Sequence, residues 1–124
     1  MSDSLELRFR DVDAFGHVYH AEYLSFLDHL RTRWLGEMGV ESPESYVVAR
    51  VEIDYVSSLL LADGAVTASF HPERVGGTSI TLREELQVHG GRLVARAQVV
   101  IVLRDVATGS KRVVTDRERA ALGV

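Results

Sequence analysis

Residues 11–23, with the sequence Asp11-Val-Asp-Ala-Phe-Gly-His-Val-Tyr-His-Ala-Glu-Tyr23, lie where two hydrophobic patterns meet. Before them, residues 5–10 alternate between apolar and charged side chains, which is the period of two of a half-buried strand. After them, from about Val18 to Met38, apolar residues recur at helical spacing until Gly36 and Gly39 end the pattern. The sequence therefore predicts a strand, a short connecting segment and one long helix of about five turns.

The remainder of the chain predicts mainly strands joined by turns. Alternating side chains and the turn signals Asp63-Gly64, Gly76-Gly77 and Gly90-Gly91 divide it into elements. We expect strands over residues 47–55, 66–70, 80–89 and 92–104, a short edge strand over 111–114 and a short closing helix over 116–122. This order favours an α+β fold, in which a curved antiparallel sheet of about five strands wraps round the long helix.

The two faces of the sheet bear on assembly. In the strand over residues 47–55, alternation places Val47 and Val51 on one face and Val48 and Arg50 on the other. One helix covers only one face of a sheet, and the opposite face is expected still to carry Val, Leu and Ile side chains. Such a face usually packs against another subunit, so the sequence predicts a homodimer or a homotetramer.

Composition and charge limit the classes of function. The 124 residues fit a single domain that spans residues 1–124, and no Cys is present to form a disulfide, a thiolate metal site or a Cys nucleophile. The net charge is −4 with no run of like charges, which argues against a nucleic-acid partner. The first ten residues do not form a secretory signal, and no stretch is apolar enough to span a membrane. We therefore expect a cytoplasmic protein without a membrane partner.

The segment between the first strand and the helix carries residues suited to acyl-transfer chemistry. Asp13 lies a few residues before the helix, and Gly16 allows a positive φ or a close backbone approach. The amides of roughly Val18 to His20 begin the helix, and their unpaired N–H groups and the helix dipole favour negative charge. A carboxylate facing such an oxyanion site could hydrolyse a thioester, because the thiol leaving group has a pKa near ~8.5 and needs no strong acid.

Simpler interpretations of the same residues stay open. Asp13 could cap the helix or form an Asx turn, since its side chain accepts backbone N–H bonds. His17 and His20, with Asp13, could bind a metal, but the H-E-x-x-H pattern is absent, so we expect no metal and no other cofactor. Tyr23 also fits a core position on the helix.

Residues 5–60 resemble the 4-hydroxybenzoyl-CoA thioesterase family of the hotdog fold. The matching pieces are Arg8-Phe-Arg-Asp-Val-Asp13, Gly16-His-Val-Tyr-His20, Tyr23-Leu, Phe26-Leu-Asp-His-Leu-Arg31-Thr-Arg-Trp-Leu35 and Val51-Glu-Ile-Asp-Tyr55. The first pieces are fairly specific, because they combine D-x-D-x-x-G with an aromatic-rich helix start. The resemblance implies a curved sheet wrapped round the helix, dimers with active sites between subunits, and acyl-CoA or acyl-carrier-protein thioesters as substrates.

The resemblance also implies roles for individual residues. Asp13 occupies the position of the family's catalytic carboxylate, which acts as nucleophile or as general base, and the His20 amide occupies that of its oxyanion donor. The His20 side chain matches a histidine, common in the acyl-CoA thioesterase branch, that positions water or substrate. The residues expected to bind substrate are Phe15, Gly16, His17, Val18, Tyr19 and Tyr23. Phe15 and His17 depart from the family, in which many members have Gly and a small apolar residue there.

Two other classes of function are weighed against this one. A non-catalytic acyl-binding or assembly module on the same fold would need no carboxylate facing helix amides. A hotdog hydratase would need an acid–base pair of Asp and His on the helix, in a local pattern that the sequence lacks. We also expect Asp11, two residues before Asp13, to have little part in the reaction.

Overall fold

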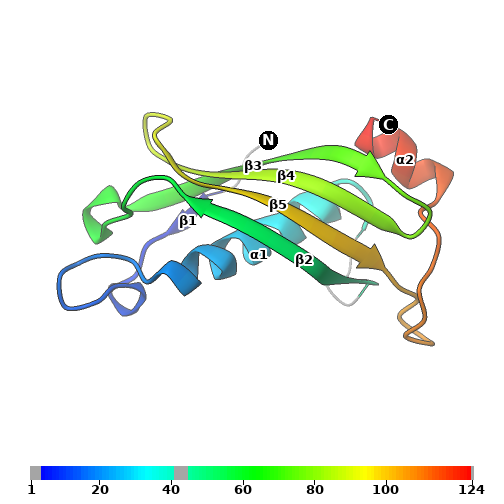
Figure 1. The fold of residues 1–124 in the computed structure, drawn as a ribbon, viewed down its shortest axis with the longest axis horizontal. Helices are drawn as coiled ribbons and strands as arrows, with labels where there is room; N and C mark the ends of the chain where they lie inside the picture. The colour runs from blue at the N-terminus through cyan, green and yellow to red at the C-terminus, as the bar shows by residue number, and fades with distance from the viewer. Residues whose placement is uncertain (1–3, 41–44, 124) are drawn as a thin grey trace.

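The computed structural model describes residues 4–40 and 45–123. Its elements, in chain order, are β1 (Ser4–Glu6), a 3-10 helix (Phe9–Asp11), α1 (His20–Glu37), β2 (Tyr46–Tyr55), a 3-10 helix (Leu61–Asp63), β3 (Ala65–Val75), β4 (Ser79–Val88), β5 (Leu93–Leu103) and α2 (Asp116–Leu122). The strands form one antiparallel sheet in the order β1-β3-β4-β5-β2. Figure 1 shows α1 running along the length of this curved sheet, which confirms the α+β arrangement predicted from the sequence.

The hydrophobic core lies between α1 and the inner face of the sheet. Helical spacing gathers Phe26, Leu27 and Leu30 on the buried side of α1, which packs against β1, β3 and β4. Alternate residues of β4 and β5 form the other wall, all of them fully buried: Ile80, Leu82, Leu86, Val99, Ile101 and Leu103. Burial of each such side chain stabilises the fold by roughly 1.5–3 kcal/mol relative to exposure. No helix within residues 4–40 and 45–123 is long and apolar enough to cross a membrane.

A charged pair interrupts this apolar interface. Arg31 on α1 and Glu84 on β4 are 2% and 0% exposed, and Nε and Nη2 of Arg31 donate to the two carboxylate oxygens of Glu84 at 2.6 and 2.8 Å. Asp28, one helical turn earlier, accepts from Nη1 of Arg31 at 2.7 Å. Burial alone would lower the pKa of Arg31, but the hydrogen bonds and charge of Glu84 outweigh it and hold that pKa above its ordinary value. The pair therefore fixes the position of α1 on β4.

The N-terminal strand is shorter than its sequence pattern predicts. β1 ends at Glu6, and Phe9 lies in a 3-10 helix with 84% of its surface exposed. The reason is a local turn, in which Nη2 and the backbone amide of Arg8 both donate to the Asp11 carboxylate, at 2.8 and 2.9 Å. Near the other end, residues 111–114 make an isolated bridge to Arg104 instead of the expected edge strand. The helix predicted over residues 116–122 is confirmed.

Strand β2 is an edge strand whose inner face α1 covers only at its two ends, near Tyr46 and Tyr55. The pairing of β2 with β5 shifts register between Val48 and Arg50, so Val48 joins Val51 on the inner face rather than facing outward as simple alternation predicts. Val48, Val51 and Tyr55 remain 40%, 38% and 45% exposed. Apolar surface of the sheet is therefore left uncovered along the middle of the inner side of β2.

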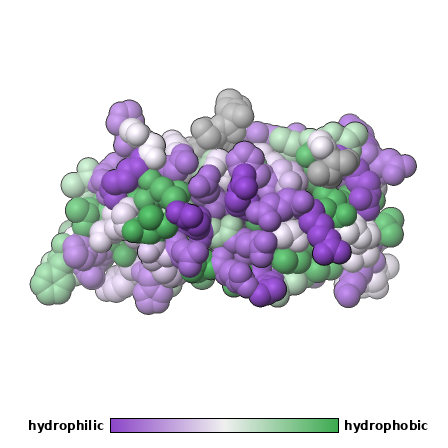
Figure 2. All heavy atoms as spheres, turned by 45° about the horizontal axis from the view of Figure 1, so that its top comes forward, coloured by the Kyte–Doolittle hydropathy of each residue, from purple (hydrophilic) through white to green (hydrophobic). Residues whose placement is uncertain are grey.

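The outer face of the sheet differs from the sequence-based expectation. Its central part is polar and lines an open depression of about 540 Å3, to which β2, β4 and β5 contribute Glu52, Asp54, Arg83, Glu85, Arg96 and Gln98. Figure 2 shows one face of the molecule on which hydrophilic side chains predominate and hydrophobic patches are small. The expected cover of Val, Leu and Ile is wrong for the centre of the outer face, because the apolar residues of β4 alternate inward.

Candidate functional site

The carboxylate of Asp13 is held by the loop that leads into α1. Its Oδ1 accepts hydrogen bonds from the backbone amides of Phe15, at 2.9 Å, and of His17, at 3.1 Å. Backbone pairing closes the same loop, since the Asp13 amide donates to the His17 carbonyl at 2.9 Å and Gly16 adopts a φ of 78°. These bonds are the Asx turn that the sequence left open. They occupy one carboxylate oxygen, and Oδ2 of Asp13 has no partner within the residues that the structure describes.

The first turn of α1 provides fewer free amides than the sequence predicts. The helix begins at His20, and the two amides before it are already bonded: Val18 donates to the Leu59 carbonyl at 2.8 Å, and Tyr19 to the Asp11 carbonyl at 3.2 Å. Val18 therefore does not belong to the helical donors. The amides of His20 and Ala21 have no acceptor within residues 4–40 and 45–123, and the positive end of the helix dipole lies there. They are the atoms suited to bind an oxyanion.

A pocket of about 300 Å3 opens beside this helix end. It is lined by Val18, His20, Tyr23, Tyr55, Val56, Ser57 and Ser58. The rings of His20 and Tyr23 both meet the ring of Tyr55 edge-on, with centroids 6.0 and 5.1 Å apart. The hydroxyl of Tyr55 donates to the His20 carbonyl at 3.3 Å, which ties the end of β2 to the start of α1. The wall of the pocket is therefore aromatic, with two small hydroxyl residues at its edge.

Tyr23 serves both the core and this pocket. It is almost fully buried, and its hydroxyl accepts a hydrogen bond from the Leu59 amide at 3.1 Å. Burial raises the pKa of Tyr23 above its ordinary value. Its ring therefore forms part of the pocket wall, and its hydroxyl holds Leu59 in the connection between β2 and β3.

The residues expected to form the site separate into two groups. Val18, His20 and Tyr23 line the pocket, and Val18 and Tyr23 are buried. The other expected residues do not line the pocket but belong to the loop before α1: Asp13, Phe15, Gly16, His17 and Tyr19. In this loop, Phe15 is 84% exposed. Sequence reasoning missed Tyr55, Ser57 and Ser58, which follow one another closely at the end of β2. The signal that could have found them is Tyr55 as the last residue of a strand in the family's pattern.

Asp11 has a structural role in the loop. It is fully buried, its Oδ2 accepts from the Arg8 amide and Nε, and its Oδ1 accepts from Nη2 of Arg8. Burial alone would raise the pKa of Asp11, but the hydrogen bonds from Arg8 outweigh it and lower that pKa below its ordinary value. Its backbone carbonyl also accepts the Tyr19 amide. Asp11 therefore holds the loop in shape, in a 3-10 helix over Phe9–Asp11 rather than in an extended strand.

Metal ligation finds little support in the geometry. Within residues 4–40 and 45–123, no group of three or more His, Cys, Asp or Glu side chains could hold a metal ion.

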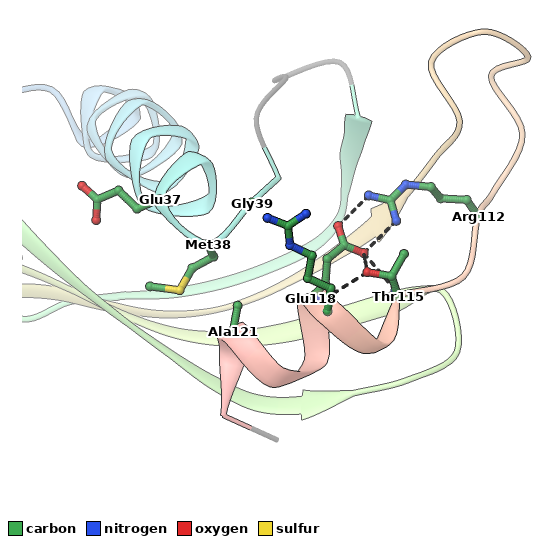
Figure 3. A pocket seen from close by; sticks show the side chains of 8 residues that line it. Glu37, Met38, Gly39, Arg112, Thr115, Glu118 and Ala121 are labelled. Carbon is green, nitrogen blue, oxygen red and sulfur yellow. Dashed lines mark hydrogen bonds and ion pairs between the residues drawn. The ribbon is translucent and has the colours of Figure 1, made fainter.

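A separate cavity of about 500 Å3 lies at the far end of α1, between Met38 and α2 (Figure 3). Its polar wall is an ion pair, in which both Nη atoms of Arg112 donate to the Glu118 carboxylate at 2.8 Å. With a helix of 18 residues between them, about 27 Å separates this cavity from the Asp13 loop.

Known proteins of related sequence and structure agree with this architecture. The model of the thioesterase-like superfamily matches residues 7–121. No curated protein matches the chain. A thioesterase from Thermus thermophilus, solved in complex with coenzyme A and Zn, is 26% identical with a TM-score of 0.86, over 99% of this chain and 97% of that one.

Two further solved structures share the fold. A predicted thioesterase from Bacillus stearothermophilus is 26% identical with a TM-score of 0.83, over 98% of this chain and 92% of that one. The protein SAV2348 from Staphylococcus aureus, solved in complex with CoA, is 15% identical with a TM-score of 0.85, over 98% of this chain and 80% of that one. Together with the match over residues 7–121, these likenesses establish the hotdog fold, and the chain belongs to the thioesterase-like superfamily.

Proposed function

We propose that this protein hydrolyses acyl-CoA or acyl-carrier-protein thioesters, with Asp13 as the catalytic carboxylate. The observation that carries the proposal is the pairing of two features in one short loop. The loop fixes the Asp13 carboxylate through Oδ1 and leaves Oδ2 without an internal partner among the described residues. It then enters α1 with the amides of His20 and Ala21 free to bind an oxyanion.

Either of two steps would use this arrangement. As a general base, Asp13 takes a proton from water while the oxygen of that water attacks the thioester carbonyl carbon. As a nucleophile, the carboxylate attacks that carbon itself and forms an anhydride, which water then hydrolyses. In both, the carbonyl oxygen gains negative charge near the amides of His20 and Ala21, the C–S bond breaks, and the sulfur leaves as a thiolate that is then protonated.

The other loop residues would serve the substrate in different ways. His20 belongs to the pocket, so we assign its side chain to the positioning of water or of the acyl group. Val18 and Tyr23 would contact the acyl group from the pocket wall. Gly16, Phe15, His17 and Tyr19 form the surface of the loop and would contact the carrier part of the thioester. The thioesterase from Thermus thermophilus holds coenzyme A, which supports CoA as that carrier.

The free inner side of β2 supports a homodimer or homotetramer in which a second copy covers the pocket. Val51 is more than a third exposed, although an inner-face residue of a sheet is normally buried. Pairing of two β2 edges would satisfy their unpaired backbone groups and place a partner over Tyr55. Sedimentation at micromolar protein concentration should show a dimer or a tetramer, and a stable monomer would contradict this part of the proposal.

A panel of thioesters tests the activity itself. Acyl-CoA substrates of different chain length and aromaticity, together with acyl-carrier-protein thioesters, are incubated with the protein, and release of free thiol is followed. The expected result is catalytic turnover of at least one class. Binding of acyl-CoA without any thiol release would instead indicate a non-catalytic acyl-binding module and would make Asp13 a turn residue only.

A further inference from the structure

One arginine outside the candidate site braces the segment that forms part of its wall. Arg92 follows the Gly90-Gly91 turn between β4 and β5. Its Nη1 donates to Ser57 Oγ at 2.8 Å and to the Ser58 carbonyl at 2.9 Å, and its Nη2 donates to Asp63 Oδ2 at 3.0 Å. We infer that Arg92 is a positioning residue for the proposed hydrolysis, and the inference rests on that proposed function.

The braced segment, residues 57–63, is in direct contact with the loop that carries Asp13. The Leu61 amide donates to the Gly16 carbonyl at 3.1 Å, and the Leu59 carbonyl accepts the Val18 amide at 2.8 Å. His17 forms a bridge with Leu60. The segment is thus a backbone partner of the loop on both sides of His17, the residue whose amide binds Asp13. A shift of the segment would move the Asp13 carboxylate with it.

The same segment also borders the pocket. Ser57 and Ser58 line it, and the Leu59 amide donates to the hydroxyl of Tyr23. Ser57 Oγ further donates to the Leu93 carbonyl at 2.8 Å, so Ser57 is held from two directions. Arg92 therefore acts on both parts of the candidate site, the carboxylate loop and the pocket wall, through one short piece of chain.

The geometry of the brace suits arginine and its partner Asp63. The guanidinium is a planar fork, and here its two ends reach the beginning and the end of the segment at once. Asp63 Oδ2 also accepts the Leu60 amide at 2.9 Å, which closes the turn within the segment. The Arg92 and Asp63 side chains are 45% and 21% exposed, so the ion pair adds little to global stability. Its effect is on the position of the segment.

The test compares Arg92→Ala, Arg92→Lys, Asp63→Ala and the double variant Arg92→Ala/Asp63→Ala with the wild-type protein. The substrates are the best acyl-CoA and the same acyl group on N-acetylcysteamine, which lacks the CoA phosphates. For Arg92→Ala we expect kcat to fall roughly 10- to 100-fold on both substrates, as for a small displacement of catalytic groups, with KM nearly unchanged. Lysine cannot form the fork, so Arg92→Lys should not restore kcat.

Coupling between the two partners is the decisive measurement. If Arg92 acts through Asp63 and the segment, the double variant should be no slower than the slower single variant. Arg96→Ala is the matched control, because Arg96 is an exposed arginine on the outer face of β5 that contacts neither the segment nor the loop within the described residues. Its kcat should equal that of the wild type. Thermal unfolding of every variant shows whether activity is measured on folded protein.

Three results would overturn the inference. The first is a rise in KM for the CoA thioester alone that Arg92→Lys reverses, which would make Arg92 a phosphate ligand. The second is full additivity of the two single changes. The third is wild-type kcat in folded Arg92→Ala or, if that variant does not fold, in folded Asp63→Ala. If the wild type itself releases no thiol from any thioester, it is the proposed function that fails, and this outcome is distinct from all three.

Discussion

Two carboxylates near α1 lie in opposite environments: Glu84 of β4, against the middle of the helix, and Asp13, in the loop before its start. In the middle, Glu84 meets Arg31 in the core, and both carboxylate oxygens are bonded to the guanidinium. At the beginning, Asp13 lies in a partly exposed loop with only Oδ1 bonded, to backbone amides, among the described residues. The buried carboxylate is out of reach of a substrate, whereas the loop carboxylate is partly exposed and has one oxygen without a partner among the described residues. Charge in the interior of this protein serves the architecture, and charge at the helix start is available for chemistry.

The same contrast recurs within the loop itself, over a distance of two residues. Asp11 is fully buried and both its oxygens are bonded to Arg8, while Asp13 is partly exposed. Closeness in sequence therefore does not decide which aspartate can react. The decisive properties are solvent access and the number of oxygens that the protein itself already uses.

The largest expected effect is the loss of catalysis in Asp13→Asn. The change keeps the size of the side chain and its oxygen for the Phe15 and His17 amides, but removes the charge. We expect kcat to fall roughly 10²–10⁴-fold with KM little changed, as for a positioned acid–base group. Stability should fall by no more than about 1 kcal/mol, the size of a lost cap. Thiol release and denaturant unfolding of the same preparation measure both quantities.

Asp11→Asn sharpens that result as a contrasting variant. It weakens a buried ion pair, so we expect a clear loss of stability and, in the folded fraction, a much smaller loss of kcat than in Asp13→Asn. Wild-type kcat in folded Asp13→Asn would contradict the mechanism. Equal losses of kcat in both variants would show that the loop geometry matters and that the Asp13 charge does not.

The second prediction concerns the buried pair and should show the reverse pattern. Glu84→Gln leaves the Arg31 charge in the core with only Asp28 as a charged partner among the described residues. We expect the free energy of unfolding to fall by about 3 kcal/mol, the lower end for a broken buried pair. Turnover per folded molecule should stay near that of the wild type, because Glu84 belongs to neither the loop nor the pocket. Urea unfolding and kcat at low temperature are the two measurements.

A matched pair of variants isolates the cause of that instability. Glu85→Gln removes a charge at the next residue, which faces outward on the sheet, and should change stability little. The double change Arg31→Met/Glu84→Leu replaces the pair with apolar side chains and should recover most of the loss. If Glu84→Gln is as stable as the wild type, the pair does not hold α1 on β4 in the way described above.

The sequence predicted the frame of this molecule better than its polar contacts. The long helix, the hairpins at Gly76-Gly77 and Gly90-Gly91 and the closing helix all follow from periodicity and turn residues. The alternating pattern predicts a strand at Phe9, because a period of two carries no information on a local ion pair such as Arg8 with Asp11. Period two likewise gives no sign of the buried Glu84, and only Arg31 in the apolar stripe of α1 indicates that a buried partner exists.

The sequence predicts only those parts of the candidate site whose residues lie close together along the chain. Asp13 and the helix start lie close in sequence, so their association needs no knowledge of the tertiary structure. Tyr55 and Arg92 reach the site through strand pairing and a hairpin turn, from positions more than thirty residues away from α1's start. The bulge at Val48, which turns that residue to the inner face, likewise depends on pairing with β5.

The third prediction uses a carboxylate that lies between the two extremes. Glu118 in α2 is nearly buried, and hydrogen bonds from Arg112 lower its pKa to about 2 from an ordinary value of 4.5. Because the folded-state pKa is the lower one, its stabilisation is complete above about pH 4.5 and is lost as the pH falls toward about 2. We expect this contribution to be on the order of 2 kcal/mol.

Urea midpoints measured between about pH 6 and about pH 2.5 test this in the wild type and in Glu118→Gln. The variant should be less stable at neutral pH and should lose less stability on acidification. Asp116 is an exposed carboxylate of the same helix, and Asp116→Asn should follow the wild-type curve. Parallel curves for wild type and Glu118→Gln would show that the Arg112 bonds do not shift the Glu118 pKa in solution.

The smallest expected effect is that of a chelator on turnover, which we expect to be none. His17, His20 and Asp13 are the nearest candidates for a metal site, but no cluster of three or more His, Cys, Asp or Glu side chains that could hold a metal ion exists within the described residues. The thioesterase from Thermus thermophilus was solved with Zn, so it is informative to measure whether a chelator changes the kcat of this protein. Prolonged dialysis against a strong chelator should leave kcat unchanged. The opposite result would be that the chelator removes the activity, that added Zn restores it, and that Zn has no such effect in His17→Ala/His20→Ala. The start of α1 would then be a metal site and not an oxyanion site.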